Sequence, residues 1–396
     1  MTEDTTPPTD RRTDTTTSRL SRRKVLATTG VAGAAALAGC GGFLGGGGDG
    51  GPSAGEVGLA QFRGSGPLVE ARGELGGTRI ADLPDLSGEQ NSYIGGGEGG
   101  LYIDLLDLFT RIYDDFSYSQ NMDASASLAN TIVTEVEQGS SRADMFISVD
   151  AGSLAAVAQE GAAESLPSEV TDMPDGDFAT DNWVGVAGRA RAIPYNTNQL
   201  SASDIPDTVQ EFPEVAAFEN NLGWAPSYSA FQSFVTAMRL LRGEEETRQW
   251  LVDLREMGTL TFDNEFLVST SVADGELAAG FANHYYALRV RNSRQNAPLD
   301  LAFTSGDAGA LINVSGGLVI QGTENRDLAN LLLRHLLSAE AQEFFATRTF
   351  AYPTVPEIPP AGGLPSVDEL NPPDIDLTQL SDQDATLDLL RETNVL

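Results

Sequence analysis

Two adjacent tyrosines, Tyr285 and Tyr286, carry the most distinctive chemistry in the sequence. They follow an amide and an imidazole, Asn283 and His284, at the end of a short run of small and apolar residues that predicts a strand, so a helix is expected to begin at the pair. Hard cations prefer such an oxygen-rich cluster, and a highly charged one can displace a phenolic proton whose ordinary pKa is about 10. The alternative is a pair that simply packs as an amphipathic element at a strand-to-helix junction.

The histidine and lysine content argues against several classes of enzyme. His284 and His335 are the only histidines, so the H-E-x-x-H pattern of zinc hydrolases is absent. Lys24 is the only lysine, and its place near the N-terminus leaves none for a phosphate-binding loop in the body of the chain. His335 lies beside leucines on a predicted helix, where we expect a structural role. We therefore expect a protein that is not an enzyme.

The N-terminus has the pattern of an export signal. Ser21-Arg22-Arg23-Lys24 precedes an Ala- and Gly-rich apolar run that is too short to span a membrane, which is typical of a twin-arginine signal over residues 1–39. Leu37-Ala38-Gly39-Cys40 resembles a lipobox, and Cys40 is the only cysteine, so a lipid anchor is predicted there and a disulfide framework is excluded. We expect a protein held by lipid on the extracellular face of the cytoplasmic membrane.

The chain is strongly acidic, with a formal net charge of −33. Removal of residues 1–39 takes away six basic and four acidic residues, including the only lysine, and the charge becomes −35. Such an acidic, lysine-poor surface is typical of halophilic proteins such as haloarchaeal ones, in which dense carboxylates keep the protein hydrated at high salt. The same charge argues against a nucleic-acid partner, because a polyanion would be repelled.

Strands and helices alternate along the body of the chain, which predicts an α/β fold with a doubly wound sheet. Residues 40–88 are predicted to form a Gly-rich tether and an N-terminal extension, with the folded body beginning near Asn91. In such sheets ligands bind at the carboxyl ends of the strands, where Asp150 is expected. The first predicted elements are a strand at 91–94, a helix at 101–116, a strand near Tyr118, a helix at 127–136 and a strand at 143–149.

The second half of the chain continues the same alternation. Two strands, at 183–186 and 190–195, are expected on either side of Gly188-Arg189. A helix is expected to follow Tyr228, and one long helix is predicted over residues 326–345.

A glycine-rich loop lies between the first predicted strand and helix. Gly95, Gly97 and Gly100 have the G-x-G-x-x-G spacing of a dinucleotide-binding turn, with Asp123 about twenty residues further on. Glu98 inside the loop would repel a pyrophosphate. The loop is better suited to present backbone amides of a helix N-terminus to a small or metal-bound anion, or to form a tight turn.

Five segments occur in an order and at a spacing that match a known family. Together they resemble the ferric-ion substrate-binding proteins of ABC importers, and the similarity covers residues 90–396. The segments are Ser141-Arg142-Ala143-Asp144-Met145-Phe146 with Asp150-Ala151-Gly152-Ser153-Leu154; Trp183-Val184-Gly185-Val186-Ala187-Gly188-Arg189-Ala190-Arg191 with Tyr195-Asn196-Thr197; Trp224-Ala225-Pro226-Ser227-Tyr228-Ser229-Ala230-Phe231-Gln232; Asn283-His284-Tyr285-Tyr286; and Asp307-Ala308-Gly309-Ala310-Leu311.

The resemblance implies a two-lobed, type II periplasmic-binding-protein fold whose doubly wound sheets are joined by a hinge. It implies a first lobe of residues 89–188 with 303–350 and a second lobe of residues 189–302 with 351–396.

The resemblance also implies a metal site. The tyrosine pair of the family supplies phenolate ligands to Fe³⁺, which implies that role for Tyr285 and Tyr286, and Tyr228 stands where some members carry a third tyrosine. Other members use a histidine and an acidic residue, but those positions fall on Gly97 and Val149 here, which favours the three-tyrosine class. Residues implied to contact an anion or other ligand are Gly97, Glu98, Asp150, Ser229, Ala230, Asn264 and Asn283.

The function implied by the resemblance is capture of Fe³⁺, together with a synergistic anion, and its delivery to an ABC importer. The expected partners are the membrane permease and its ATPase, and the expected state is a monomer. Relatives of the same fold bind thiamine, phosphonates or polyamines, which is one alternative. An exported redox enzyme that uses a dinucleotide at the glycine loop is another.

Overall fold

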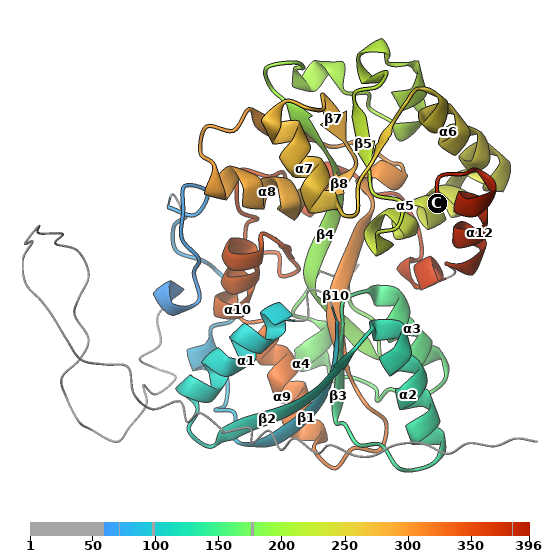
Figure 1. Cartoon of the computed structure of the whole chain (residues 1–396). Helices are drawn as coiled ribbons and strands as arrows, with labels where there is room; N and C mark the ends of the chain where they lie inside the picture. Colours follow the sequence, from blue (N-terminus) through green and yellow to red (C-terminus); the bar gives the residue numbers. More distant parts are fainter. Residues whose placement is uncertain (1–58, 71, 97–99, 176–177, 382) are drawn as a thin grey trace, which may run out of the picture. The chain divides into compact units, whose positions relative to one another are not determined.

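The computed structural model describes residues 59–70, 72–96, 100–175, 178–381 and 383–396, all of which lie in one compact unit, Gly50–Leu396. Figure 1 shows this unit as two lobes that the strands β4 (Trp183–Asn196) and β10 (Ile312–Val319) connect. The predicted signal, the predicted anchor Cys40 and the loop residues Gly97 and Glu98 lie outside the described residues.

The lower lobe in Figure 1 is built from alternating strands and helices, as the sequence predicted. Helices α1 and α9 cover one face of its sheet, and α2 and α3 cover the other. Its elements are β1 (Gly88–Gly95), α1 (Gly100–Ile112), β2 (Phe116–Asp123), α2 (Ser125–Glu137), β3 (Met145–Ser148), α3 (Ala151–Gln159), α4 (Ser168–Thr171), α9 (Arg326–Leu336), α10 (Ala339–Phe344) and β11 (Tyr352–Pro353).

The upper lobe contains shorter strands and a group of helices. Both residues of β7 are small, Ala279 and Gly280, and small residues let helices approach a sheet closely. The elements are β5 (Leu222–Trp224), α5 (Ser229–Arg242), α6 (Glu244–Glu256), β6 (Leu260–Thr261), α7 (Glu265–Asp274), β7 (Ala279–Gly280), β8 (Ala282–Asn283), α8 (His284–Ser293), β9 (Leu299–Ala302) and α12 (Asp384–Glu392), while α11 (Val367–Leu370) lies in the segment that leads to α12.

The sheet runs through both lobes in the order β2-β1-β3-β10-β4-β7-β5-β6. In the lower lobe β1 is parallel to β2 and β3, whereas β10 is antiparallel to β3 and β4. The pairing of β10 with β4 shifts register between Ser315 and Gly316, and a Cβ on Gly316 would stand 2.2 Å from the carbonyl oxygen of Val184. Only glycine permits this close approach of the two connecting strands.

Two predictions of secondary structure were wrong. β4 is one strand of 14 residues and not two strands around Gly188-Arg189. Gly188 makes no turn. A Cβ on Gly188 would stand 3.0 Å from the Cβ of Tyr352 in β11, so the absence of a side chain leaves room for Tyr352. The helix predicted over 326–345 is divided into α9 and α10, because Ser338 ends the first and accepts a hydrogen bond from the amide of Ala341 in the second.

The hydrophobic core divides in the same way as the lobes. In the lower lobe, one cluster surrounds Leu105, Val184 and Leu332, and another surrounds Phe146 and Leu154. In the upper lobe, the largest cluster is built mainly from aromatic residues, among them Phe231, Phe234, Trp250 and Phe281. The residue boundaries of the lobes given above remain a prediction.

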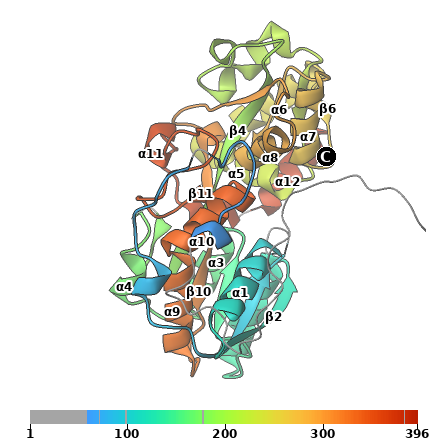
Figure 2. The same ribbon diagram turned by 90° about the vertical axis from the view of Figure 1, so that its left-hand side faces the viewer.

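The folded part of the chain begins well before Asn91, contrary to the prediction. Phe62, Ile80 and Leu86 are at most 1% exposed and belong to the core of the lower lobe. The segment also binds α10 through charge, since Arg79 Nε donates to Glu340 at 2.7 Å. Its Gly and Pro content resembles that of a linker, but its few apolar and arginine residues have buried partners. Figures 1 and 2 both show this segment, coloured blue, beside α10.

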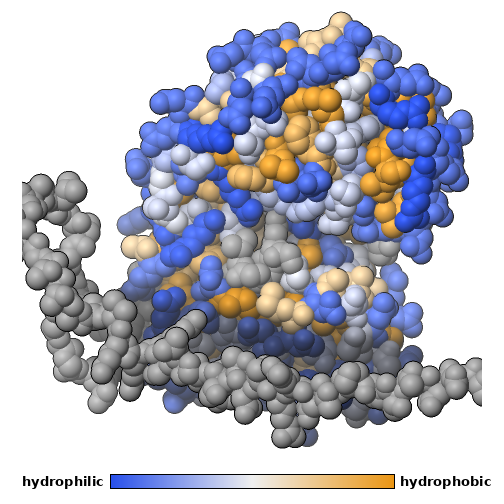
Figure 3. Space-filling view, in the orientation of Figure 1, coloured by the Kyte–Doolittle hydropathy of each residue, from blue (hydrophilic) through white to orange (hydrophobic). Residues whose placement is uncertain are grey.

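The face of the molecule in Figure 3 is covered largely by hydrophilic residues with smaller apolar areas between them. In the part of the chain that the structure describes, no helix is both long and apolar enough to cross a membrane.

Candidate metal-binding site

The tyrosine pair lies at the first turn of α8, as the sequence predicted. Strand β8 pairs with β4 through Asn283 and Arg191, and α8 begins at the next residue, His284. Tyr285 and Tyr286 are 2% and 7% exposed, and their ring centroids are 4.3 Å apart. The pair is therefore held in place by packing in a buried cluster with Val69, Leu288 and Phe350.

The third tyrosine reaches the pair from a different element. Tyr228 is half-buried and directly precedes α5, which begins at Ser229. Its hydroxyl forms a hydrogen bond with the hydroxyl of Tyr286, and the two ring centroids are 6.1 Å apart. The structure thus brings together Tyr228, Tyr285 and Tyr286, which lie 58 residues apart or less along the chain. Three phenols gathered in this way are hard oxygen donors for a highly charged cation.

The neighbouring imidazole is structural. His284 is completely buried, its Nδ1 accepts a hydrogen bond from the amide of Ala190 at 3.2 Å, and its Nε2 donates to the carbonyl of Phe350 at 2.6 Å. Burial lowers the pKa of His284 to about 4. A neutral ring with both nitrogens bonded to backbone fixes the start of α8 and has no lone pair left for a metal.

Asn283 links the tyrosines to a buried ion pair. Its Nδ2 donates to the hydroxyl of Tyr285 at 3.3 Å, and its Oδ1 accepts from Arg191 Nη1 at 3.3 Å. Arg191 also pairs with Glu265, which is completely buried and whose Oε2 accepts from the backbone amide of Asn283 at 2.7 Å. The position of Tyr285 therefore depends on a network that runs back to α7.

A hollow next to the tyrosines brings together residues from both lobes. Four predicted residues line it: Asp150, Ser229, Ala230 and Asn283. The other lining residues are Val149, Arg189, Arg191, Ser233, Leu311, Asn313 and Gln383. The three tyrosines do not line the hollow themselves, but Asn283, which does, donates to the hydroxyl of Tyr285, so the hollow lies beside the tyrosine cluster.

The hollow has the chemistry of an anion site. Arg191 is 3% exposed, and its Nη2 has no hydrogen-bond partner among the described residues. Ser229 and Ala230 are the first residues of α5, where helix geometry gives the backbone amides no acceptor within the helix. Arg191 and the first residues of α5 both line the hollow, and a guanidinium together with a helix N-terminus favours a bound anion.

Two predicted residues have local structural roles. The carboxylate of Asp150 caps α3, accepting from the amide of Ser153 at 2.7 Å, so it stands at the edge of the hollow with its charge already engaged. Asn264 caps α7 in the same way through the amide of Leu267, at 3.0 Å, and does not line the hollow. Gly97 and Glu98 lie outside the described residues.

Sequence reasoning missed Arg191 and Glu265 as members of the site. Arg191 lies in a strand made mostly of apolar residues, which is a usable signal, because a buried arginine requires a partner. Glu265 gave no signal, since it stands at the start of a helix in a chain rich in carboxylates.

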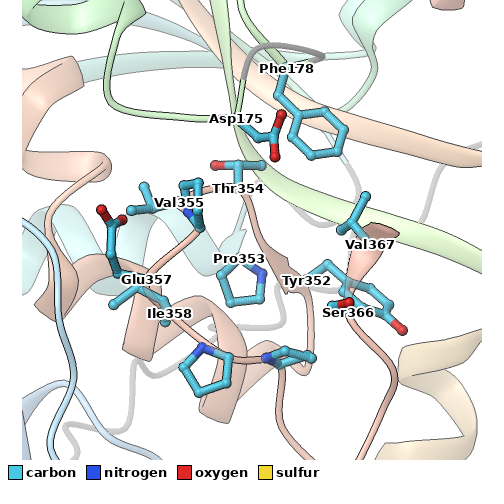
Figure 4. Close-up of a pocket in the computed structure, with 13 residues that line it drawn as sticks. Asp175, Phe178, Tyr352, Pro353, Thr354, Val355, Glu357, Ile358, Ser366 and Val367 are labelled. Carbon is cyan, nitrogen blue, oxygen red and sulfur yellow. The ribbon is translucent and has the colours of Figure 1, made fainter. Parts of the chain in front are cut away.

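A second hollow, shown in Figure 4, is lined by the proline-rich segment after Tyr352 together with Phe178 and Asp175. Tyr352 connects it indirectly to the site, since its ring centroid lies 4.7 Å from that of His284. Burial raises the pKa of the Tyr352 phenol. This hollow contains none of the predicted site residues.

Comparisons with known proteins define the class of the molecule. The chain belongs to the family described as bacterial extracellular solute-binding protein, whose model matches residues 118–371. Its fold is the two-lobed type II fold of periplasmic binding proteins: over 77% of this chain and 99% of the other, it superposes on iron-bound HitA from Pseudomonas aeruginosa with a TM-score of 0.67 and 23% identity.

Among proteins of known sequence, the chain resembles some that are named for iron. It is 30% identical to the major ferric iron-binding protein of Neisseria meningitidis over 267 residues, which cover 65% of this chain and 80% of that protein. It is 29% identical to iron uptake protein A2 of Synechocystis over 263 residues, covering 63% and 75% of the two chains.

Proposed function

We propose that the protein is an extracellular, lipid-anchored solute-binding protein of an ABC importer that captures Fe³⁺ through the phenolates of Tyr228, Tyr285 and Tyr286. The observation that carries the proposal is the meeting of these three tyrosines from two separate elements at the edge of a polar hollow. The names of the relatives support the choice of iron.

Charge explains why three phenols suit this ion. Three phenolates neutralise the charge of Fe³⁺, and each must lose its proton when the metal binds, so affinity falls as the solution is acidified. Reduction to Fe²⁺ removes one positive charge and weakens binding. The two lobes close over the ion and open again by motion about the strands that connect them.

A synergistic anion would complete the coordination of the metal. The hollow beside the phenols is lined by Arg191, Ser229, Ala230 and Asn283, whose guanidinium and amide groups would hold the anion.

The remaining parts of the proposal concern location and partners. Cys40 carries the lipid after twin-arginine export, and the loaded protein docks on a membrane permease that is driven by an ATPase. The protein acts as a monomer and does not bind nucleic acid. If iron is not the ligand, the unpartnered guanidinium nitrogen of Arg191 favours an anionic organic solute such as a phosphonate over a cationic one such as thiamine or a polyamine.

A ferric titration followed by visible absorption tests the proposal. We expect a phenolate-to-iron charge-transfer band that saturates at one equivalent and is absent from the variant in which Tyr228, Tyr285 and Tyr286 are all changed to Phe. A band that survives in the variant would remove the tyrosines from the site. Absence of a band in the unmodified protein would reject iron and direct the search to phosphonates by calorimetry.

A further inference from the structure

The segment that precedes β1 is anchored to the lower lobe by a buried carboxylate. Glu343 of α10 is completely buried, and it accepts hydrogen bonds from Arg63 Nε and Arg72 Nη2, both at 2.6 Å. Arg72 also donates to the carbonyls of Pro359 and Pro360, at 2.8 and 2.9 Å. A buried carboxylate that loses its counter-ions is strongly destabilised, so the segment remains on α10 while the protein is folded.

The same segment contacts the helix that carries the tyrosines. Val69 is 3% exposed and belongs to the buried cluster that contains Tyr285, Tyr286, Leu288 and Phe350. Near the other end of α8, Asn292 Nδ2 donates to the carbonyl of Ser65 at 3.2 Å. Gly66 adopts a φ of 119°, and a Cβ there would stand 2.3 Å from Asn292 Oδ1, so the backbone of the segment lies directly against α8.

We propose that residues 59–70 and 72–88 form a clasp that joins the two lobes and positions α8, and with it the tyrosines, relative to α10. The clasp holds α10 through Arg63 and Arg72, and it holds α8 through Val69 and Ser65. Figures 1 and 2 both show this segment beside α10, and in Figure 1 its loop reaches α8. The part of this inference that concerns iron rests on the proposed function.

The clasp implies a coupling between residues that do not touch. The side chain of Arg72 bonds to Glu343 and to the carbonyls of Pro359 and Pro360, and none of these hydrogen bonds is with α8. If the clasp couples the position of α8 to that of α10, weakening the contacts of Arg72 must increase the mobility of α8. If the segment only covers the surface, the effect of Arg72 must stay at α10.

Three variants distinguish these cases. Val69→Ala with Asn292→Ala weakens the contact between the clasp and α8. Arg72→Gln weakens the contact between the clasp and α10, where Arg63 still compensates Glu343 and Arg79 still pairs with Glu340. The matched control is Val157→Ala with Asn182→Ala, which removes a fully buried valine and a side-chain bond to a carbonyl, that of Glu164 at 3.2 Å, from the lower lobe. Each protein is measured by hydrogen exchange over residues 284–293 and by the rate of ferric release to a chelator.

We expect exchange in α8 to rise about ten-fold and iron release about five-fold in both clasp variants, and neither to change in the control. Combining the two sets of clasp substitutions should give less than the sum of their separate effects, because they break one connection at two points. Arg72→Gln that leaves exchange in α8 unchanged would overturn the clasp. If the unmodified protein does not bind iron, the proposed function fails, and hydrogen exchange alone still decides whether the clasp exists.

Discussion

Two buried arginine–glutamate networks support this protein, and they differ in how completely their donors are used. In the clasp, Arg63 and Arg72 direct every guanidinium nitrogen to Glu343 or to a backbone carbonyl. At the candidate metal site, Arg191 bonds Glu265 and Asn283 through Nη1, and its Nη2 has no partner among the described residues.

Under the proposed function, the difference separates a structural network from one that binds a ligand. Leaving a buried donor unpaired costs free energy, so a fully satisfied network needs no further partner, whereas the proposed anion would give Arg191 one. The comparison predicts that changes at the site alter binding more than stability, and that changes at the clasp alter stability more than binding.

The largest effect is expected at the tyrosine pair. Changing Tyr285→Phe with Tyr286→Phe removes two phenolates and should lower ferric affinity at least about a thousand-fold, or about 4 kcal/mol. The rings still pack, so the midpoint of thermal unfolding should stay within about 4 °C. Chelator competition and calorimetry measure the two quantities. Unchanged affinity would remove the pair from the metal site.

Glu343→Gln should lower stability and leave ferric binding in place. It leaves two arginines without their buried carboxylate and should lower the free energy of unfolding by about 3–5 kcal/mol, while the charge-transfer band of the iron complex remains. Denaturant titration measures the loss. Glu244→Gln, which breaks an exposed pair with Arg248, is the control and should leave stability unchanged. Equal stability of both variants would show that the clasp network is not structural.

A buried histidine lies near each network, His284 at the candidate metal site and His335 near the clasp. Both should lower the free energy of unfolding in acid. Burial lowers the pKa of His284 and of His335 to about 4, against about 6.5 in the unfolded chain. Between these values the unfolded state binds protons that the folded state does not, so stability present above pH 6.5 is lost as the pH falls toward 4, by up to about 3 kcal/mol per histidine.

Denaturant titrations across that pH range measure the slope. His335 packs on Phe109, which packs on Phe62 of the clasp, so His335→Gln should flatten part of the slope without altering ferric binding. A slope that the substitution leaves unchanged would show that His335 does not contribute to it.

The smallest effect is expected from Arg191→Lys. Lysine keeps a charge beside Glu265 but loses the second guanidinium nitrogen, so the gain in ferric affinity on adding phosphate should fall about ten-fold, or about 1.4 kcal/mol. Parallel titrations with and without phosphate measure it. Arg291→Lys, at an exposed pair with Asp300, is the control. The same phosphate dependence in all three proteins would mean that Arg191 does not hold the anion.

The sequence predicted the alternating elements of the lower lobe and the placement of the tyrosines. Buried strands such as β3 and amphipathic helices such as α5 repeat with the period of their own geometry, so local pattern is enough to find them. Tyr228, Tyr285 and Tyr286 meet because each lies where a helix begins after a strand of one sheet. Their role as metal ligands remains a proposal.

Other features depend on contacts distant in sequence. In the sequence, Gly188 predicts a break in a strand. In the structure, Tyr352, which is 164 residues further along the chain, occupies the space that a side chain at Gly188 would fill. The clasp looks like a linker because its stability comes from Glu340 and Glu343, more than 250 residues away. The structure adds a local role to two predicted ligand contacts, Asn264 and Asp150, since both cap helices; capping and ligand binding select the same side chains. Their role as ligand contacts stays a prediction.

The two strands that connect the lobes have a mechanical consequence. β4 crosses between them without a loop, and glycines at 185, 188, 316 and 317 lie where it pairs with β10. A bend at that crossing is spread over many backbone torsions that each change little, and it must keep the ladder of hydrogen bonds intact. Such a joint resists deformation in proportion to the angle, so the opening of the lobes should be narrow and elastic, and should return without a barrier when the cargo leaves.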